Sequence, residues 1–290
     1  MIGNILINGL LTGGMYATLA LGFALVFSVG RIVNMAHTAL YMVGAYLFFS
    51  GVRLFGINVW ISFALAIVLA VLVGVAVFKL FIDRIKEHET AVMIITVALA
   101  MLFQEICLEV FGGRFRAVDP FIAGSVEVFG TTVTYQNFIA IGSSALALIA
   151  VWFVLKKTKI GFAIRAIAED GEIANVMGID GSRMQLLVIV MSVGLAGLAG
   201  ATTAPITMVS PQMWMGPLVV VLAAVVIGGL GSIGGSVLGA FILGYAEILV
   251  VFLVPNGSFL RGVVSLGLMI LVLLIKPEGL FGVTFEEERL

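Results

Sequence analysis

Long apolar segments alternate with short polar ones along the whole chain. Each apolar segment approaches the roughly 20 residues that an α-helix needs to cross the hydrocarbon core of a bilayer. Strands of a membrane β-barrel would alternate polar and apolar positions, which segments such as "ISFALAIVLAVLVGVAVF" do not. The pattern predicts an all-α polytopic membrane protein with about eight or nine transmembrane helices. The predicted spans are 5–29, 36–50, 58–81, 91–111, 137–155, 184–204, 216–230, 232–254 and 259–275.

Two of these spans, 36–50 and 216–230, are too short to cross alone, so we expect them to be broken or re-entrant. The N-terminal segment lacks the basic region of a secretory signal, so we interpret it as the first span. All spans follow one another without a soluble insertion, and we treat 1–290 as a single transmembrane domain.

Lysine and arginine gather in two connecting loops, 79–90 and 156–183. Positive loops stay in the cytoplasm, so both loops should face it. Two predicted crossings separate them, and the loop between them, which holds only Arg114 and Arg116, should face outward. By the same alternation the C-terminal segment should be cytoplasmic and the N-terminus outside.

Composition removes several classes of protein. The chain is 62% hydrophobic and only 11% charged, with a net charge of −1, which argues against a soluble domain and against nucleic acid as a partner. With Cys107 alone, no intrachain disulfide can form. Two histidines and one cysteine leave little for a metal site or a nucleophilic triad, so we expect no catalytic residue and no metal. No G-x-x-x-x-G-K-[ST] occurs, so this chain has no P-loop to bind ATP.

Glycines cluster in the last third of the chain, where they indicate either close helix packing or a broken helix beside a substrate path. The candidate pathway or packing glycines are Gly194, Gly197, Gly200, Gly228, Gly229, Gly231, Gly234 and Gly235. Gly231, Gly235 and Gly239 follow the small-xxx-small spacing of close helix pairs. Gly229, Gly231 and Gly234 also spell the dinucleotide fingerprint, but no strand or soluble βαβ unit surrounds them.

Few ionisable groups fall inside the predicted spans. Glu105 and Glu247 are candidate intramembrane polar residues, and such carboxylates often mark ion paths. Arg31, Asn34 and His37 fall at helical spacing between two spans, which we interpret as a polar corner at the membrane surface.

The segment 161–178 is too short and too charged to span a membrane. Its pattern predicts two short helices that meet at Gly171, with one apolar face and one charged face. The predicted apolar face consists of Ile164, Ile167, Ala168, Ile173, Ala174 and Met177. The polar face carries Glu169, Asp170 and Glu172, which anionic lipid would repel. A cytoplasmic protein partner therefore fits this face better than lipid does.

Four blocks resemble one known family: "NGLLTGGMYATLALGFALVFSVGRIVNMAH", "RAIAEDGEIANVMGID", "SVGLAGLAGA" and "AAVVIGGLGSIGGSVLGAFILGYAE". In this order they are similar to the branched-chain amino acid permeases of bacterial ABC importers, specifically the shorter H-type permease; urea and amide importer permeases are close relatives. The resemblance implies a coupling helix at 161–178, contacting an ATPase subunit. The residues implied for coupling are Arg165, Ala168, Glu169, Asp170, Ala174 and Gly178. Thr38 and Ala39 depart from the family, which commonly has a glycine and an acid there.

The resemblance also implies partners and a mechanism. They are a second, M-type permease, two ATPase subunits that bind ATP and Mg²⁺, and an extracytoplasmic substrate-binding protein, all at the bacterial inner membrane. ATP would drive alternating access of the permease pair. An ion-coupled transporter or channel that uses Glu247 or Glu105 stays open as an alternative, whereas a membrane enzyme lacks a catalytic constellation. The substrate, a branched-chain amino acid, urea or an amide, is left open.

Overall fold

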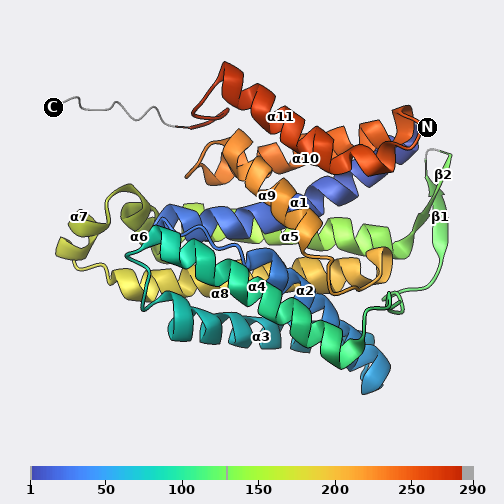
Figure 1. Cartoon of the computed structure of the whole chain (residues 1–290), viewed down its shortest axis with the longest axis horizontal. Helices are drawn as coiled ribbons and strands as arrows, with labels where there is room; N and C mark the ends of the chain where they lie inside the picture. The colour runs from blue at the N-terminus through green and yellow to red at the C-terminus, as the bar shows by residue number, and fades with distance from the viewer. Residues whose placement is uncertain (1, 129, 283–290) are drawn as a thin grey trace.

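The computed structural model describes residues 2–128 and 130–282. Most helices run along one common axis between two ends of the molecule (Figure 1). One end holds the strands β1 (Ser125–Val128) and β2 (Thr131–Thr134), and we call it the hairpin end. The other holds the short helices α6 (Lys159–Glu169) and α7 (Gly171–Val176), and we call it the α7 end.

The predicted helical membrane fold is confirmed. The long elements are α1 (Ile2–Gly30), α2 (His37–Phe49), α3 (Val59–Val77), α4 (Glu89–Phe111), α5 (Tyr135–Lys157), α8 (Gly181–Thr207), α9 (Met215–Gly228), α10 (Ile233–Leu253) and α11 (Arg261–Ile275). The other short elements are the π-helical segments η1 (Ser50–Leu54) and η2 (Phe78–Ile82) and the 3-10 helix η3 (Gly257–Leu260). Within the described residues, 7 helical segments are long and apolar enough to cross a bilayer, and α9 is a shorter apolar helix.

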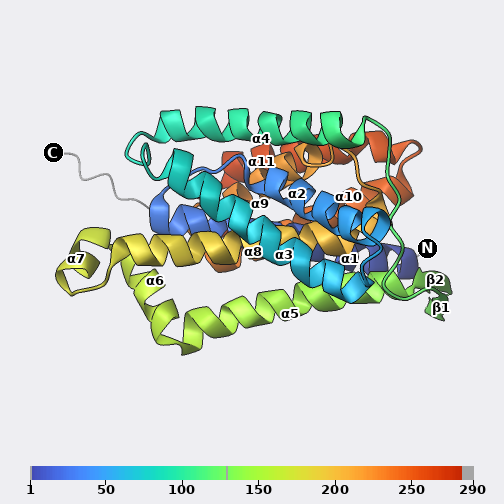
Figure 2. The ribbon, with the colours of Figure 1, turned by 90° about the horizontal axis from the view of Figure 1, so that it is seen from below.

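The two short spans are half-length helices that are each entered through irregular chain. Helix α2 begins part-way along the bundle, after residues 31–36 have run inward from the α7 end (Figure 2). Helix α9 likewise follows residues 208–214, which come from the hairpin end (Figure 1). Each helix then continues to the opposite end, so both spans are broken but neither is re-entrant. Irregular backbone at membrane depth must be satisfied by protein; here Met35 N donates to Thr96 Oγ1 (3.2 Å) and Ala36 N to Asn34 Oδ1 (3.1 Å).

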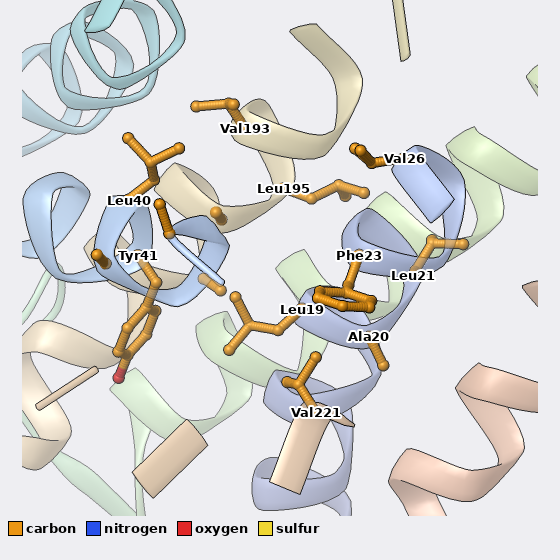
Figure 3. Close-up of a cluster of buried hydrophobic side chains, with 14 of the residues drawn as sticks. Leu19, Ala20, Leu21, Phe23, Val26, Leu40, Tyr41, Val193, Leu195 and Val221 are labelled. Atoms are coloured by element: carbon orange, nitrogen blue, oxygen red, sulfur yellow. The ribbon is translucent and has the colours of Figure 1, made fainter. Parts of the chain in front are cut away.

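Helix α1 is the central helix. In its most apolar stretch 72% of residues are buried, against 6% for the η3–α11 segment. Figure 3 shows Leu19 and Phe23 of α1 amid Leu40 and Tyr41 of α2 and Val193 of α8. Small residues let neighbours approach α1 closely. A Cβ at its Gly13 would lie 2.7 Å from the Phe241 ring, and one at Gly22 would lie 2.8 Å from His37.

The outward loop contains an antiparallel hairpin that we did not predict, with Ser125 opposite Thr134. Its sequence signal was a β-branched run, "TTVT", after a glycine. That Gly130 has φ +69, a conformation that glycine adopts without strain. Gln136 then ties this loop to the bundle, because its amide donates to Thr202 O (2.8 Å) and accepts from Phe121 N (3.1 Å).

Candidate functional site

The segment after α5 folds as two short helices, as the sequence predicted. Thr158 stops α5 and caps α6: its hydroxyl donates to Val154 O (2.6 Å) and accepts from Gly161 N (3.1 Å). Asp170 separates α6 from α7 with an extended backbone, and its carboxylate accepts from Ile173 N (2.9 Å). An aspartate at this position satisfies a free N–H of the following helix.

The predicted single apolar face of this segment is wrong. Ile164, Ile167 and Ala174 turn inward and are 0%, 8% and 4% exposed. In contrast, Ile173 and Met177 are 62% and 78% exposed. The reason is the extended residue Asp170, which resets the helical phase, so apolar positions of α6 and α7 do not lie on one face. The outward apolar residues of α7 are Ile173, Val176 (87% exposed) and Met177, and we call them the α7 tip.

The other residues predicted for coupling are spread over the segment. Glu169 and Asp170 are exposed beside the α7 tip. Gly178 follows α7 with φ +86. Ala168 is half-buried and lines a cavity, whereas Arg165 lies at a different groove between α5, α6 and α10.

The two basic loops lie at the same end of the molecule, as predicted. Lys86, in the loop between α3 and α4, donates to Gln185 Oε1 in the first turn of α8 (3.2 Å). The same ammonium pairs with Asp83 at 2.9 Å. Residues 276–282 also return to the α7 end (Figure 1); the remainder of the predicted cytoplasmic tail, 283–290, lies outside the described residues.

The glycines between α9 and α10 form a tight reversal. A Cβ at Gly228 would collide with Gly235, and one at Gly235 would collide with the Gly228 carbonyl. Gly229 and Gly231 have φ +99 and +91, so the turn uses backbone that other residues rarely adopt. Gly231 therefore precedes α10 and belongs to the turn instead of a packing face of the helix. A Cβ at Gly234 would meet nothing within 4 Å.

The C-terminal segment forms hydrogen bonds with the end of α9 at this reversal. Leu280 N donates to Ile227 O (2.8 Å) and Phe281 N to Gly228 O (3.1 Å). These are carbonyls of the last turn of α9, which have no partner within the helix itself. Leu280 and Phe281 thus cap α9, a contact that no sequence pattern predicted.

A cavity of about 270 Å³ joins α6 to the glycine turn. It is lined by Ser28, Arg31, Ala168, Leu230, Gly231, Ser232 and Phe281. The two features that the sequence singled out, the amphipathic segment and the glycine run, therefore meet at one place.

The glycines of α8 divide into two kinds. Gly197 lies against Gly44 of α2, where a Cβ at Gly44 would come within 2.7 Å of the Gly197 Cα. A Cβ at Gly200 would collide with the carbonyl of Tyr41. Gly194 has only an ordinary contact, 3.8 Å from Val71. Gly197 and Gly200 are thus packing positions between α8 and α2, and Gly194 is not.

The intramembrane carboxylates lie in different surroundings. Glu247 is 1% exposed and its two oxygens accept from Tyr16 Oη (3.0 Å) and Ser265 Oγ (2.6 Å). Through these two hydrogen bonds Glu247 of α10 links α1 to α11. Glu105 is exposed on α4, next to Gln104, which accepts from Trp214 Nε1 (2.9 Å).

The predicted surface corner at residues 31–37 is wrong for His37. Its ring is buried, with Nε2 3.0 Å from Leu19 O and Nδ1 3.1 Å from Ser192 Oγ. Because residues 31–36 run inward without forming a helix, they carry His37 to the interior and leave Arg31 exposed at the cavity. Thr38 and Ala39, the departures from the family pattern, are also fully buried.

Comparison with known proteins gives one consistent family. The family model described as "Branched-chain amino acid transport system / permease component" matches residues 5–273. The chain is 28% identical to the high-affinity branched-chain amino acid transport system permease protein LivH of Salmonella typhimurium, over 95% of this chain and 94% of that one. It is 25% identical to the permease protein LivM of Escherichia coli, over 95% of this chain and 69% of LivM.

A solved structure shows the same fold. The chain is similar to one in the structure of PsaBC from Streptococcus pneumoniae in complex with Fab, with a TM-score of 0.54 and 16% identity. The match covers 94% of this chain and 92% of that one.

Proposed function

The chain belongs to the family of permease components of branched-chain amino acid transport systems, and on this premise we propose that it is the H-type permease subunit of an ATP-driven importer. The substrate is a branched-chain, hydrophobic amino acid or a related small solute such as urea or an amide. The subunit lies in the bacterial inner membrane with its α7 end in the cytoplasm, and the lysines and arginines of the two loops at that end support this orientation.

The α7 tip is the observation that carries this proposal. Ile173, Val176 and Met177 are largely exposed, although they lie at the polar end of the bundle. The neighbouring Glu169, Asp170 and Glu172 would be repelled by anionic lipid. A protein surface that combines an apolar pocket with basic groups satisfies both sets of residues, and we assign it to an ATPase subunit.

In this proposal α6 and α7 transmit motion of the ATPase subunit to the helix bundle. Ile164, Ile167 and Ala174 anchor it on the bundle, and Ala168 faces the cavity that the glycine turn lines. When the partner ATPases bind ATP and Mg²⁺ and close, a force on the α7 tip would move α6 at the wall of the cavity that the α9–α10 junction also lines. The half-length helices α2 and α9 are the discontinuous elements around which such a permease would alternate between inward- and outward-facing states.

Three kinds of partner complete the importer. A second, M-type permease forms the other half of the pathway; the match to LivM supports this pairing. Two ATPase subunits hold the nucleotide, because this chain has no P-loop. An extracytoplasmic binding protein delivers substrate to the hairpin end.

The test places a charge on the α7 tip. Val176→Asp and Met177→Asp should each abolish ATPase copurification and leucine uptake while the membrane level stays normal, since both side chains face outward. A buried charge at an interface costs several kcal/mol when it has no partner. Phe115→Asp is the matched control for ATPase copurification and membrane level, because Phe115 is an exposed apolar residue at the opposite, hairpin end. Normal ATPase binding by both tip variants would refute the docking assignment. Ala174→Asp is unsuitable, because Ala174 is buried within this chain.

A further inference from the structure

A lateral groove of about 550 Å³ opens beside α5, away from the cavity described above. It is lined by Leu21, Leu148, Ile149, Trp152, Leu155, Lys156, Arg165, Ile233, Gly234 and Val237. All these residues are apolar or glycine except Lys156 and Arg165, which come from the α5–α6 junction at the α7 end. The groove is therefore an apolar channel with two cations at one end.

The exposed side of α5 indicates what covers the groove. Between residues 138 and 153 its exposed side chains are apolar: Phe138, Ala145, Leu146, Ile149, Ala150, Trp152 and Phe153, with Gly142. Helix α4, on the opposite edge of the molecule in Figure 2, instead exposes Glu105 and Glu109. Carboxylates are disfavoured against lipid, so α4 suits a protein neighbour and α5 suits acyl chains.

The α5–α6 junction brings the two cations to the groove, and neither is paired with an acid within residues 2–128 and 130–282. Gly161 packs against the end of α5, so that α6 turns back beside it. Arg165 Nε donates to Gly161 O (3.4 Å), which orients the guanidinium. Among the described residues no carboxylate forms a salt bridge with Lys156 or Arg165. Their positive charge at the cytoplasmic membrane surface remains available to a ligand.

We infer that this groove binds an anionic phospholipid, with its phosphate on Lys156 and Arg165 and one acyl chain along Ile149, Trp152 and Val237. Basic residues with an adjacent aromatic residue at the cytoplasmic interface are the usual means of holding such a headgroup. The inference divides the amphipathic segment in two: the start of α6 binds lipid, whereas the acidic stretch from Glu169 to Glu172 and the α7 tip bind a protein. It also assigns Arg165 to lipid instead of the ATPase. It does not depend on the transported substrate.

Trp152 provides the probe, because it lines the groove. The full chain, coexpressed with its partners, is reconstituted in phosphatidylcholine vesicles that contain increasing fractions of either brominated phosphatidylglycerol or brominated phosphatidylcholine. Subtracting the signal of Trp152→Phe isolates this tryptophan from the other two. We expect brominated phosphatidylglycerol to quench Trp152 at several-fold lower mole fraction.

Variants then locate the headgroup and the chain. Lys156→Gln and Arg165→Gln should each weaken the phosphatidylglycerol preference about fivefold, the effect of one cation at a membrane surface. Lys157→Gln is the control, since Lys157 is exposed and adjacent but outside the groove. Gly234→Leu should fill the groove without a clash, because a Cβ there meets nothing within 4 Å, and should reduce quenching by both lipids.

Four results would overturn the inference. Equal quenching by the two lipids would mean that only acyl chains touch the groove. An equal loss with Lys157→Gln would show a general surface charge effect. Absence of quenching in the assembly would show that another subunit covers the groove. Loss of the preference on adding inorganic phosphate at constant ionic strength would identify a site for free anions.

Discussion

Ser265 Oγ donates a 2.6 Å hydrogen bond to Glu247, and this bond joins α11 to α10 in the interior of the bundle. Tyr16 of α1 holds the other carboxylate oxygen at 3.0 Å. Glu247 is the one Asp, Glu, Lys or Arg side chain that is buried in the described part of the chain, and its two hydrogen bonds join three helices. The arrangement favours a structural role over an ion path.

Removing either hydroxyl should destabilise the protein. Ser265→Ala and Tyr16→Phe each leave a buried carboxylate oxygen without its donor, at a cost of about 1–3 kcal/mol. Thermal unfolding of the detergent-purified protein measures the loss. Glu247→Gln retains an acceptor and similar shape, so it should keep uptake near normal. Lost uptake in Glu247→Gln at unchanged thermal stability would favour the ion-coupled alternative.

The α9–α10 reversal should tolerate a methyl group at one glycine and not at its neighbour. Gly235→Ala would press on the Gly228 carbonyl, and overpacking of this kind costs about 1–3 kcal/mol. Gly234→Ala meets open space and should be neutral or slightly stabilising, since alanine favours helix by up to about 1 kcal/mol. Melting temperatures of the pair provide the comparison; equal effects would show that the close approach is not rigid.

Helix α8 offers a second matched pair. Gly200→Ala should collide with the Tyr41 carbonyl of α2 and lower stability by about 1–3 kcal/mol. Gly194→Ala adds only an ordinary contact with Val71 and should be close to neutral. Expression level and thermal stability of the two variants check the difference. A larger effect at Gly194 would contradict the packing of α8 on α2.

Membrane sidedness can be read by labelling single cysteines. In a Cys107→Ser background, cysteines at Lys86 and Lys159 should react only from the cytoplasmic side, and one at Arg114 only from outside. The reason is that the first two lie at the α7 end and Arg114 lies in the loop at the other end. Reaction of Lys86 and Lys159 positions from opposite sides would disprove this topology.

Hydrophobic segment length predicted the helices well, because a bilayer imposes both the length and the apolarity of each span. The residue pattern within 161–178 predicted the break at Gly171, where the local capping residue Asp170 begins the second helix. The burial of His37 was not predicted, since nothing in "RIVNMAH" shows that the chain runs inward before α2 begins. The face of Ile173 was missed for a related reason. The prediction assumed one continuous helical phase over 161–178. The extended residue Asp170 changes that phase between α6 and α7.

The cap on α9 was out of reach of any local pattern. Leu280 and Phe281 bond carbonyls more than 50 residues earlier in the chain, so their role depends on the packing of α11. The same holds for the cavity that Ala168 and the glycine turn line together. Both features depend on the tertiary packing of segments that lie far apart in the sequence.

The described chain starts and finishes on opposite sides, since residue 2 lies at the hairpin end and residue 282 at the α7 end. This asymmetry limits how such subunits can be joined in one polypeptide. Two copies fused head to tail through a short soluble linker would force the second to insert upside down. A single-chain dimer with both halves in parallel therefore needs one extra spanning helix between them, whereas a soluble ATPase domain can follow the C-terminal end directly.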